Sequence, residues 1–428
     1  MLSCFLIVLI LFDYLWMIYS INEKNTTGVV CSFLLYYTFY DFTFINISLS
    51  LGGSFSGLLK IVFELIIVYV FVKNMKSIDY KEEKALSLIF ISFICSFLVS
   101  IFGKDEFSLL MQGFRLYFEY IFVGMVLYWG RLFEKINIEA LYNFFGAIVI
   151  LLFVYGLYQN ETISTIDDFW FYDYFSNNSD IFTDDEVNYF RDDKVRVTSI
   201  FDGPINSSLY YSYAASFFIT FYRKNLNSLL YIIVALLGIY MSHTRIGFVV
   251  LLLYFSCFIF IKAKIRYLLL IPLIYIAIIF LSLIFGLYDE SSALGRLPQY
   301  ILLPELFRFS GLGLADEYVI VYFDSFLISS LLAMGVFSIF FYMFFVIFVK
   351  RCRQFILQHH LTNDVGNDLL YVKYAYLLTF ASLGIIAFQY YTGSASYKIY
   401  LLFVFVAFYN LKKEKVISYE NNSVSNNI

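Results

Sequence analysis

The sequence predicts an all-α integral membrane protein that crosses the bilayer about twelve or thirteen times. Three observations lead to this fold class. Hydrophobic residues make up 61% of the chain, whereas an average soluble domain has about 45–50%. Charged residues make up only 14%. The apolar residues also gather into runs of about 20, which is the length that a helix needs to span a membrane. This surplus of apolar side chains fits helices whose outer faces meet lipid.

Candidate spans follow one another along most of the chain. The first begins at Leu2, because no basic region or small-residue cleavage site marks a removable signal peptide. The predicted spans are 2–19, 29–48, 56–74, 85–102, 111–129, 138–157, 206–222, 226–243, 246–262, 267–287, 324–349, 370–391 and 396–411. A single miscount near the start would leave twelve and move the N-terminus to the other side.

Lysine and arginine residues in the short loops predict the orientation. They form six clusters, at 73–84, 131–135, 223–224, 262–266, 350–353 and 412–415. All six fall on one side of the membrane if the spans alternate. That side is expected to be cytoplasmic, because basic residues are enriched in short cytoplasmic loops.

Two long segments on the opposite side divide the chain. We expect N-terminal membrane helices over 1–157, a first large loop over 158–205 and central helices over 206–287. A second large loop over 288–323, C-terminal helices over 324–411 and a tail over 412–428 follow. Long loops between packed helices are usually functional or disordered. Both loops contain aromatics, prolines and glycines, so we expect them to fold as caps.

Several functional classes find no support in the sequence. The formal net charge of -4 suggests no nucleic-acid partner. The five cysteines form no CxxC pair, so neither a zinc site nor a disulfide framework is indicated. There is no phosphate-binding glycine loop of the Walker type. We therefore predict neither a metal nor a cofactor.

The first group of candidate functional residues closes the first large loop, over 196–207. Arg196 lies shortly before a predicted helix for which Asn206 and Ser207 are plausible N-caps. An arginine beside a helix N-terminus suits an anion, because the backbone N–H groups and the guanidinium both donate to it. The alternative is a loop that merely turns between Asp202 and Pro204.

Other candidates lie at the same predicted side. His243 and Arg245 occupy a tight turn over 242–247, where snorkelling to the interface is the alternative. The second large loop contains Arg296 and Arg308, and Arg308 could instead stack on its aromatic neighbours. Asp324 begins the eleventh span, where a carboxylate is costly unless it is paired or functional; it is also a good N-cap.

One ionisable pair is predicted within a span. Arg115 and Glu119 are four residues apart in the span 111–129, where they can pair along one helix. Ionisable residues inside a membrane suggest function, although a purely structural pair fits equally well.

Together these motifs resemble the superfamily of O-antigen polymerases (Wzy) and O-antigen ligases over roughly 196–346. The stretch 196–206 resembles the family's segment of arginine followed by Pro-Asn, except that Ile205 separates Pro204 from Asn206. The turn 242–247 resembles its Ser-Arg-x-Gly turn, and 295–296 and 311–313 resemble its second periplasmic loop. Residues 324–327, with Gly335, resemble the helix start that follows.

The resemblance implies a bacterial inner-membrane glycosyltransferase with a GT-C-like fold and a periplasmic active face. Its substrates would be donor and acceptor oligosaccharides linked to undecaprenyl diphosphate in the lipid bilayer. A chain-length regulator and a flippase would be its protein partners. Ligases of the superfamily tend to carry a histidine near the position of Asp324, which favours a polymerase here. The alternatives are the ligase itself and a lipid-linked oligosaccharide flippase, which should show short external loops and charged residues deep in the bundle.

The implied chemistry breaks the bond between a sugar C1 and a diphosphate. Arg196, Arg245 and Arg296 would stabilise the charge on the departing diphosphate, because the guanidinium fork suits phosphate oxygens. Asp324 would orient or deprotonate the acceptor hydroxyl, with Asp202 as the reserve base. Five side chains are expected to contact the substrate: Asp202, Asn206, His243, Arg308 and Arg115.

Overall fold

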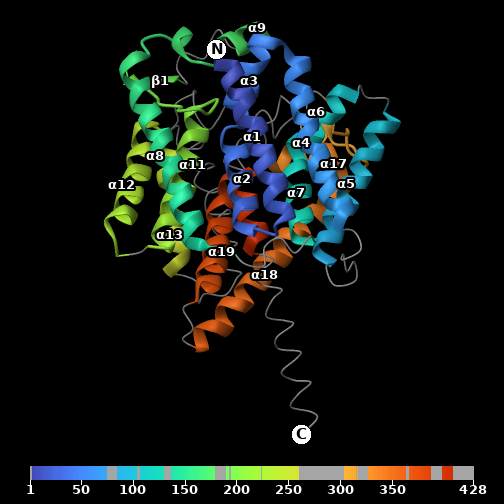
Figure 1. Cartoon of the computed structure of the whole chain (residues 1–428). Helices are drawn as coiled ribbons and strands as arrows, with labels where there is room; N and C mark the ends of the chain where they lie inside the picture. The colour runs from blue at the N-terminus through green and yellow to red at the C-terminus, as the bar shows by residue number, and fades with distance from the viewer. Residues whose placement is uncertain are drawn as a thin grey trace, which may run out of the picture. The chain divides into compact units, whose positions relative to one another are not determined.

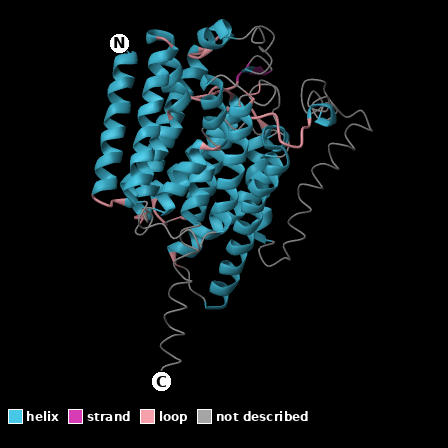
Figure 2. Ribbon diagram, turned by 90° about the vertical axis from the view of Figure 1, so that its right-hand side faces the viewer, coloured by secondary structure: helices cyan, strands magenta, loops and turns pink. Residues whose placement is uncertain are grey.

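The computed structural model is almost entirely helical over the residues that it describes (Figure 2). These are 2–74, 84–103, 107–129, 136–178, 189–191, 194–222, 224–259, 303–314, 316, 326–362, 366–386 and 398–407. The chain divides into two compact units. The first comprises Met1–Ile78, Val126–Leu252 and Ser394–Asn410, and the second comprises Asp79–Met125, Leu253–Gly393 and Leu411–Ile428.

The first unit is a bundle built from two separate parts of the chain and a late helix. Its N-terminal helices are α1 (Leu2–Asn22), α2 (Thr26–Thr38), α3 (Tyr40–Leu51) and α4 (Gly53–Asn74). Its central helices are α8 (Ile138–Thr162), α11 (Pro204–Thr220), α12 (Leu226–Met241) and α13 (Arg245–Ile259), the last of which runs on into the second unit. A helix over Lys398–Ala407 joins them.

Hydrogen bonds between helix termini define one end of this bundle. Lys73 at the end of α4 donates to the Asn22 side chain at the end of α1, at 2.8 Å. The backbone N–H of Asn137, just before α8, donates to Thr27 at the start of α2, also at 2.8 Å. The opposite end carries the chain's N-terminus and α9 (Tyr172–Asn178), which contacts α3 (Figure 1). The helices of this unit therefore alternate in direction as the sequence predicts.

Small residues bring the helices of the first unit close together. A Cβ atom on Gly238 of α12 would lie 2.6 Å from the Tyr211 ring of α11. A Cβ on Gly247 of α13 would lie 2.9 Å from the backbone oxygen of Ser208. Such approaches are typical of helix packing in membranes, where van der Waals contact replaces the hydrophobic effect. Gly247 therefore has a packing role in the 242–247 turn.

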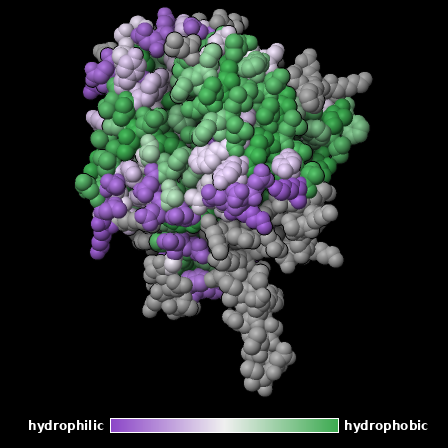
Figure 3. Space-filling model, viewed as in Figure 1, coloured by the Kyte–Doolittle hydropathy of each residue, from purple (hydrophilic) through white to green (hydrophobic). Residues whose placement is uncertain are grey.

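Part of the predicted membrane-spanning pattern is present. Four helices in the described part of the chain are long and apolar enough to cross a membrane, or up to six if each of two bent pairs is one span. Apolar side chains cover the middle of the face that carries α1 and α4, and hydrophilic ones lie toward its ends (Figure 3). Most of the remaining predicted spans are shorter helices here or, like 267–287, lie outside the described residues. The span 370–391 falls on a 20-residue helix over Asn367–Ile386, which is not among these candidate spans.

The two bent pairs differ from the straight spans that the sequence predicts. The span 29–48 is α2 and α3, which meet at 54°. The span 111–129 is α6 (Phe107–Tyr117) and α7 (Glu119–Trp129), also at 54°. The prediction that Arg115 and Glu119 share one helix is therefore wrong, because the helix breaks at Phe118 between them. Hydropathy alone cannot predict such a break, because the residues on both sides of it are apolar.

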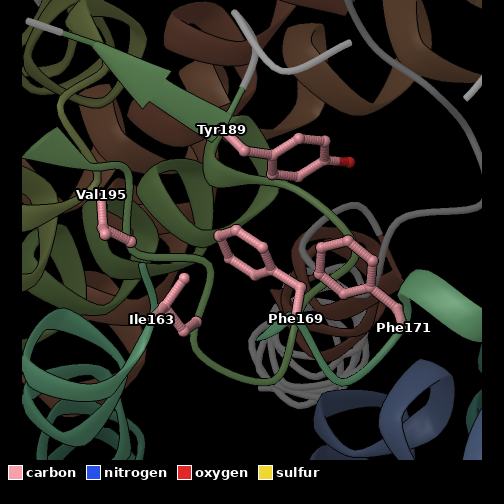
Figure 4. Close-up of a cluster of buried hydrophobic side chains, with 5 residues drawn as sticks. All are labelled: Ile163, Phe169, Phe171, Tyr189 and Val195. Carbon is pink, nitrogen blue, oxygen red and sulfur yellow. The ribbon is translucent and has the colours of Figure 1, made fainter. Parts of the chain in front are cut away.

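The structure describes residues 163–178, 189–191 and 194–203 of the first large loop. After α8, which extends to Thr162, come a 3-10 turn (Ile166–Asp168), α9 and a two-stranded antiparallel ribbon, β1 (Phe190–Arg191) and β2 (Lys194–Val195). Five buried apolar side chains form a core of its own (Figure 4). They are Ile163, Phe169, Phe171, Tyr189 and Val195. These described residues are therefore folded, whereas a cap over the whole of 158–205 stays a prediction.

The second unit contains α5 (Lys84–Phe102), α6, most of α7, α17 (Phe326–Met334), α18 (Ser338–Thr362) and α19 (Asn367–Ile386). A 3-10 turn at Gly335–Phe337 breaks the path from α17 to α18. The N–H groups of Leu312 and Gly313 donate to the carbonyls of Leu332 and Ala333, at 2.8 and 3.1 Å. This part of the second large loop thus satisfies carbonyl groups at the helix break.

Candidate functional site

Hydrogen bonds between Ser199 and α8 hold the residues that precede α11 against that helix. Gln159 donates to the Ser199 carbonyl at 2.8 Å, and its Oε1 accepts from the Ser199 N–H at 2.6 Å. Ser199 has a φ of 55° and donates from its hydroxyl to the Leu152 carbonyl at 2.8 Å. The buried Gln159 therefore replaces the missing backbone partners of a tight turn, and this turn fixes the start of α11.

Helix α11 begins earlier than the sequence predicts. Gly203 is its N-cap and Pro204 occupies its first turn, so Asn206 and Ser207 lie inside the helix. The prediction that they cap it is wrong. Proline suits a first turn because it has no N–H to leave unpaired. Asn206 instead donates from Nδ2 to Oδ1 of Asp202 at 2.6 Å. The asparagine thus orients the carboxylate.

Asp202 is held by hydrogen bonds at both its side chain and its backbone. It is half-buried, and the Tyr189 hydroxyl donates to its backbone carbonyl at 3.0 Å. Burial raises the pKa of its carboxyl above the usual value, and the opposing effects of the Asn206 hydrogen bond and the Lys398 charge are smaller. A carboxylate with a raised pKa is a stronger base than an ordinary aspartate.

Three further charged side chains of the first unit are linked electrostatically to Asp202, either directly or through Asp41. None of them is among the residues selected from the sequence. Asp41, in the first turn of α3, is within electrostatic reach of Asp202, Lys398 and Lys60. Lys398 is buried at the start of the Lys398–Ala407 helix, and Lys60 is half-buried in α4. A signal was present, because all three lie in predicted spans, where ionisable residues suggest function.

Aromatic rings line this charged cluster. The Lys398 ammonium lies 3.7 Å from the ring centroid of Tyr40, and the Lys60 ammonium lies 4.9 Å from the same centroid. Lys60 also lies 4.9 Å from the Phe44 ring centroid. Cation–π attraction of this kind is worth about 2 kcal/mol or more where the cation is desolvated. The rings therefore help to hold two positive charges in a largely apolar bundle.

Arg196 belongs to the same region through Tyr189. Its backbone N–H donates to the Tyr189 carbonyl at 2.8 Å, and the Tyr189 hydroxyl contacts Asp202. The arginine is half-buried. The neighbouring Val197 N–H donates to the Met241 carbonyl at 3.1 Å, which joins this segment to the end of α12.

The 242–247 turn therefore lies at the same end of the bundle as this segment, as predicted. The guanidinium in this turn is not buried, however. Arg245 is exposed at the start of α13. His243 has a φ of 47° and its ring centroid is 5.8 Å from that of Tyr240. The exposed guanidinium agrees better with the alternative of snorkelling to the interface.

The remaining predicted residues belong to the second unit or are not described. Arg308 is exposed and Arg115 is half-buried at the end of α6. Arg296 and Asp324 lie outside the described residues, so their predicted roles stay predictions. Within the described part of the chain, no three His, Cys, Asp or Glu side chains gather as metal ligands would.

Comparisons with protein-family models, with curated proteins and with solved structures find no match for this chain. The element of the site geometry with the clearest chemical meaning is the cluster of Asp41, Asp202, Lys60 and Lys398, which we call the charged cluster.

Proposed function

We propose that this membrane protein is an O-antigen polymerase, a glycosyltransferase that joins oligosaccharide units linked to undecaprenyl diphosphate. The observation that carries the proposal is the charged cluster beside Asn206, next to the described residues of the first large loop. It offers a carboxylate of raised pKa and two cations at one end of an apolar bundle. Glycosyl transfer from a lipid diphosphate needs a base and a positive environment for the leaving group.

Asp202 takes the role of base in this proposal. Asn206 fixes the direction of its carboxylate, and burial makes the carboxylate more basic. It would accept the proton of the attacking sugar hydroxyl as the new glycosidic bond forms. Asp41 is the second carboxylate of the cluster, and its negative charge disfavours ionisation of both acids at once.

Lys60 and Lys398 take the role that the resemblance assigns to arginines. An ammonium is a point charge with three donors, which suits a diphosphate that moves as the sugar leaves it. Arg196 would add a planar fork from the neighbouring segment. These cations stabilise the negative charge that grows on the departing diphosphate in an environment of low dielectric constant. The proposed location is a bacterial inner membrane, with the charged cluster at the periplasmic face.

The test is chain growth by the purified full-length protein in liposomes that contain undecaprenyl-diphosphate-linked repeat units. We expect a ladder of longer glycans on the lipid. Asp202→Asn should slow their formation by a factor of about 10²–10⁴, which is typical for loss of a general base. Asp167→Asn, an exposed acid in the same folded segment, should leave the ladder unchanged. The absence of chain growth in the unmodified protein would contradict the proposal.

A flippase remains the second candidate, because α2 and α3 form a helix bent by 54° with Asp41 just after the bend. Discontinuous helices beside charged residues are typical of secondary transporters. The same liposomes separate the functions. Movement of a labelled lipid-linked unit between leaflets without chain growth would indicate a flippase. Transfer of the glycan to added lipid A core, without chain growth, would indicate a ligase.

A further inference from the structure

A second polar site lies in the first unit, where α8 meets the segment 163–203. It is an open pocket of about 200 Å³. Its wall includes Tyr155 and Tyr158 from the last turns of α8, and Asp168 and Trp170 from the segment that follows. Pockets for drug-sized ligands measure about 300–1,000 Å³, so this one suits a smaller group. None of the functional roles above uses it.

Aromatic rings form one side of the pocket. Tyr155 and Tyr158 are nearly parallel, with centroids 6.2 Å apart and an angle of 24° between their planes. Trp170 donates from Nε1 to the Ser199 carbonyl at 3.1 Å, and the Phe42 ring packs edge-on against the indole at 5.0 Å. These two contacts hold the orientation of the Trp170 indole. Half-buried and exposed aromatic faces of this kind bind ligands that have one flat apolar side.

Asp168 supplies a fixed negative charge at the rim. Its Oδ2 accepts from the backbone N–H of Ser164 at 2.8 Å and of Thr165 at 2.9 Å, and the Ser164 hydroxyl donates to the same atom at 3.0 Å. These bonds lower the pKa of Asp168 to about 2. The carboxylate therefore stays ionised near neutral pH. It attracts hydroxyl donors and repels phosphates, so the pocket differs in charge from the lysines of the charged cluster.

We infer that this pocket binds one sugar ring of the glycan substrate. The C–H face of a pyranose would lie on the aromatic rings, and two ring hydroxyls would donate to Asp168. The choice of a glycan substrate rests on the proposed function. The pocket is also linked to the proposed base, because Trp170 is hydrogen-bonded to Ser199, which precedes Asp202 by three residues. A sugar bound here would hold the glycan beside the charged cluster.

The test is sugar binding by the full-length protein in detergent, followed by indole fluorescence. Trp16→Phe and Trp129→Phe together leave Trp170 as the reporter, because the chain has three tryptophans. The probes are D-glucose, D-galactose and N-acetyl-D-glucosamine at millimolar concentrations, with inorganic pyrophosphate as an anionic comparison. We expect a saturable response to at least one sugar and none to pyrophosphate.

Two variants and one control identify the site. Asp168→Asn keeps a side-chain oxygen that can accept from the N–H groups of Ser164 and Thr165, but it removes the charge. Tyr158→Ala removes an exposed ring. Each variant should weaken sugar binding about tenfold or more. The matched control Asp167→Asn should bind like the parent. A lack of response to all three sugars, or unchanged binding in both variants, would overturn the inference. Asp202→Asn should lose chain growth and keep sugar binding. The binding assay therefore tests the pocket, and the chain-growth assay tests the proposed function independently of it.

Discussion

At the scale of single residues, the acids inside the bundle fall into two kinds. Asp13 in α1 is buried, and Ser32 of α2 donates to its Oδ1 at 2.7 Å, so it joins two neighbouring helices. Asp41 and Asp202 instead lie among lysines that come from distant parts of the chain. Removing one member of such a group leaves a buried charge without compensation, which is strongly destabilising. Isosteric changes are therefore the informative ones at this site.

The raised pKa of Asp202 predicts a specific pH dependence. The basic form is populated only above the pKa, so the rate of chain growth should rise with pH through a limb above about 3.9, the value of an ordinary aspartate. Asp202→Asn should abolish this limb together with most of the rate. The measurement is the initial rate of chain growth against pH in liposomes. A limb that persists unchanged in the variant would assign the titration to another group.

At the scale of elements, helix contacts explain residues that resemble a chemical motif. Gly247 lies in the 242–247 turn, yet its structural role is the close approach of α13 to Ser208 in α11. Gly57 in α4 is a natural comparison, because a Cβ there would have no heavy atom within 4 Å. Comparing the two glycines therefore distinguishes the effect of helix packing from the low intrinsic helix propensity of glycine.

Substituting alanine at these two glycines should have opposite effects. Gly247→Ala forces a methyl group against Ser208, and overpacking of this kind costs about 1–3 kcal/mol. Gly57→Ala should be stabilising by up to about 1 kcal/mol, since alanine is the better helix former. The midpoint of thermal unfolding in detergent, compared with the parent protein, reports both. Equal midpoints for the two variants would show that α13 does not approach α11 this closely.

At the scale of the molecule, helix direction places the charged cluster and the pocket at one end of the first unit. The opposite end carries Asn22, Thr27 and Lys73, which are joined to neighbouring helix termini by hydrogen bonds. Positive residues favour the cytoplasmic side of a membrane, and Lys73 lies at this end. The first unit therefore predicts an outward-facing site without reference to the second unit.

Cysteine labelling on whole spheroplasts tests this orientation. In a background without native cysteines, Asp167→Cys should react with an impermeant thiol reagent, because this exposed residue lies in the segment 163–203. Lys24→Cys, which is exposed between α1 and α2, should react only after the membrane is permeabilised. Labelling of Lys24→Cys alone on intact spheroplasts would invert the topology, and the charged cluster would then face the cytoplasm.

The helical membrane class and the direction of successive helices in the first unit follow from the amino-acid sequence alone. Composition and run length suffice for the first, and alternation of spans suffices for the second. Asp202 and Asn206 were also selected from the sequence, because both belong to the stretch 196–206 before a predicted helix. The tertiary structure was needed to bring Asp41 and Lys398 within electrostatic reach of Asp202, and Lys60 within reach of Asp41. These residues lie in helices far apart in the chain, and hydropathy does not record which helices become neighbours, since lipid and protein interiors are equally apolar.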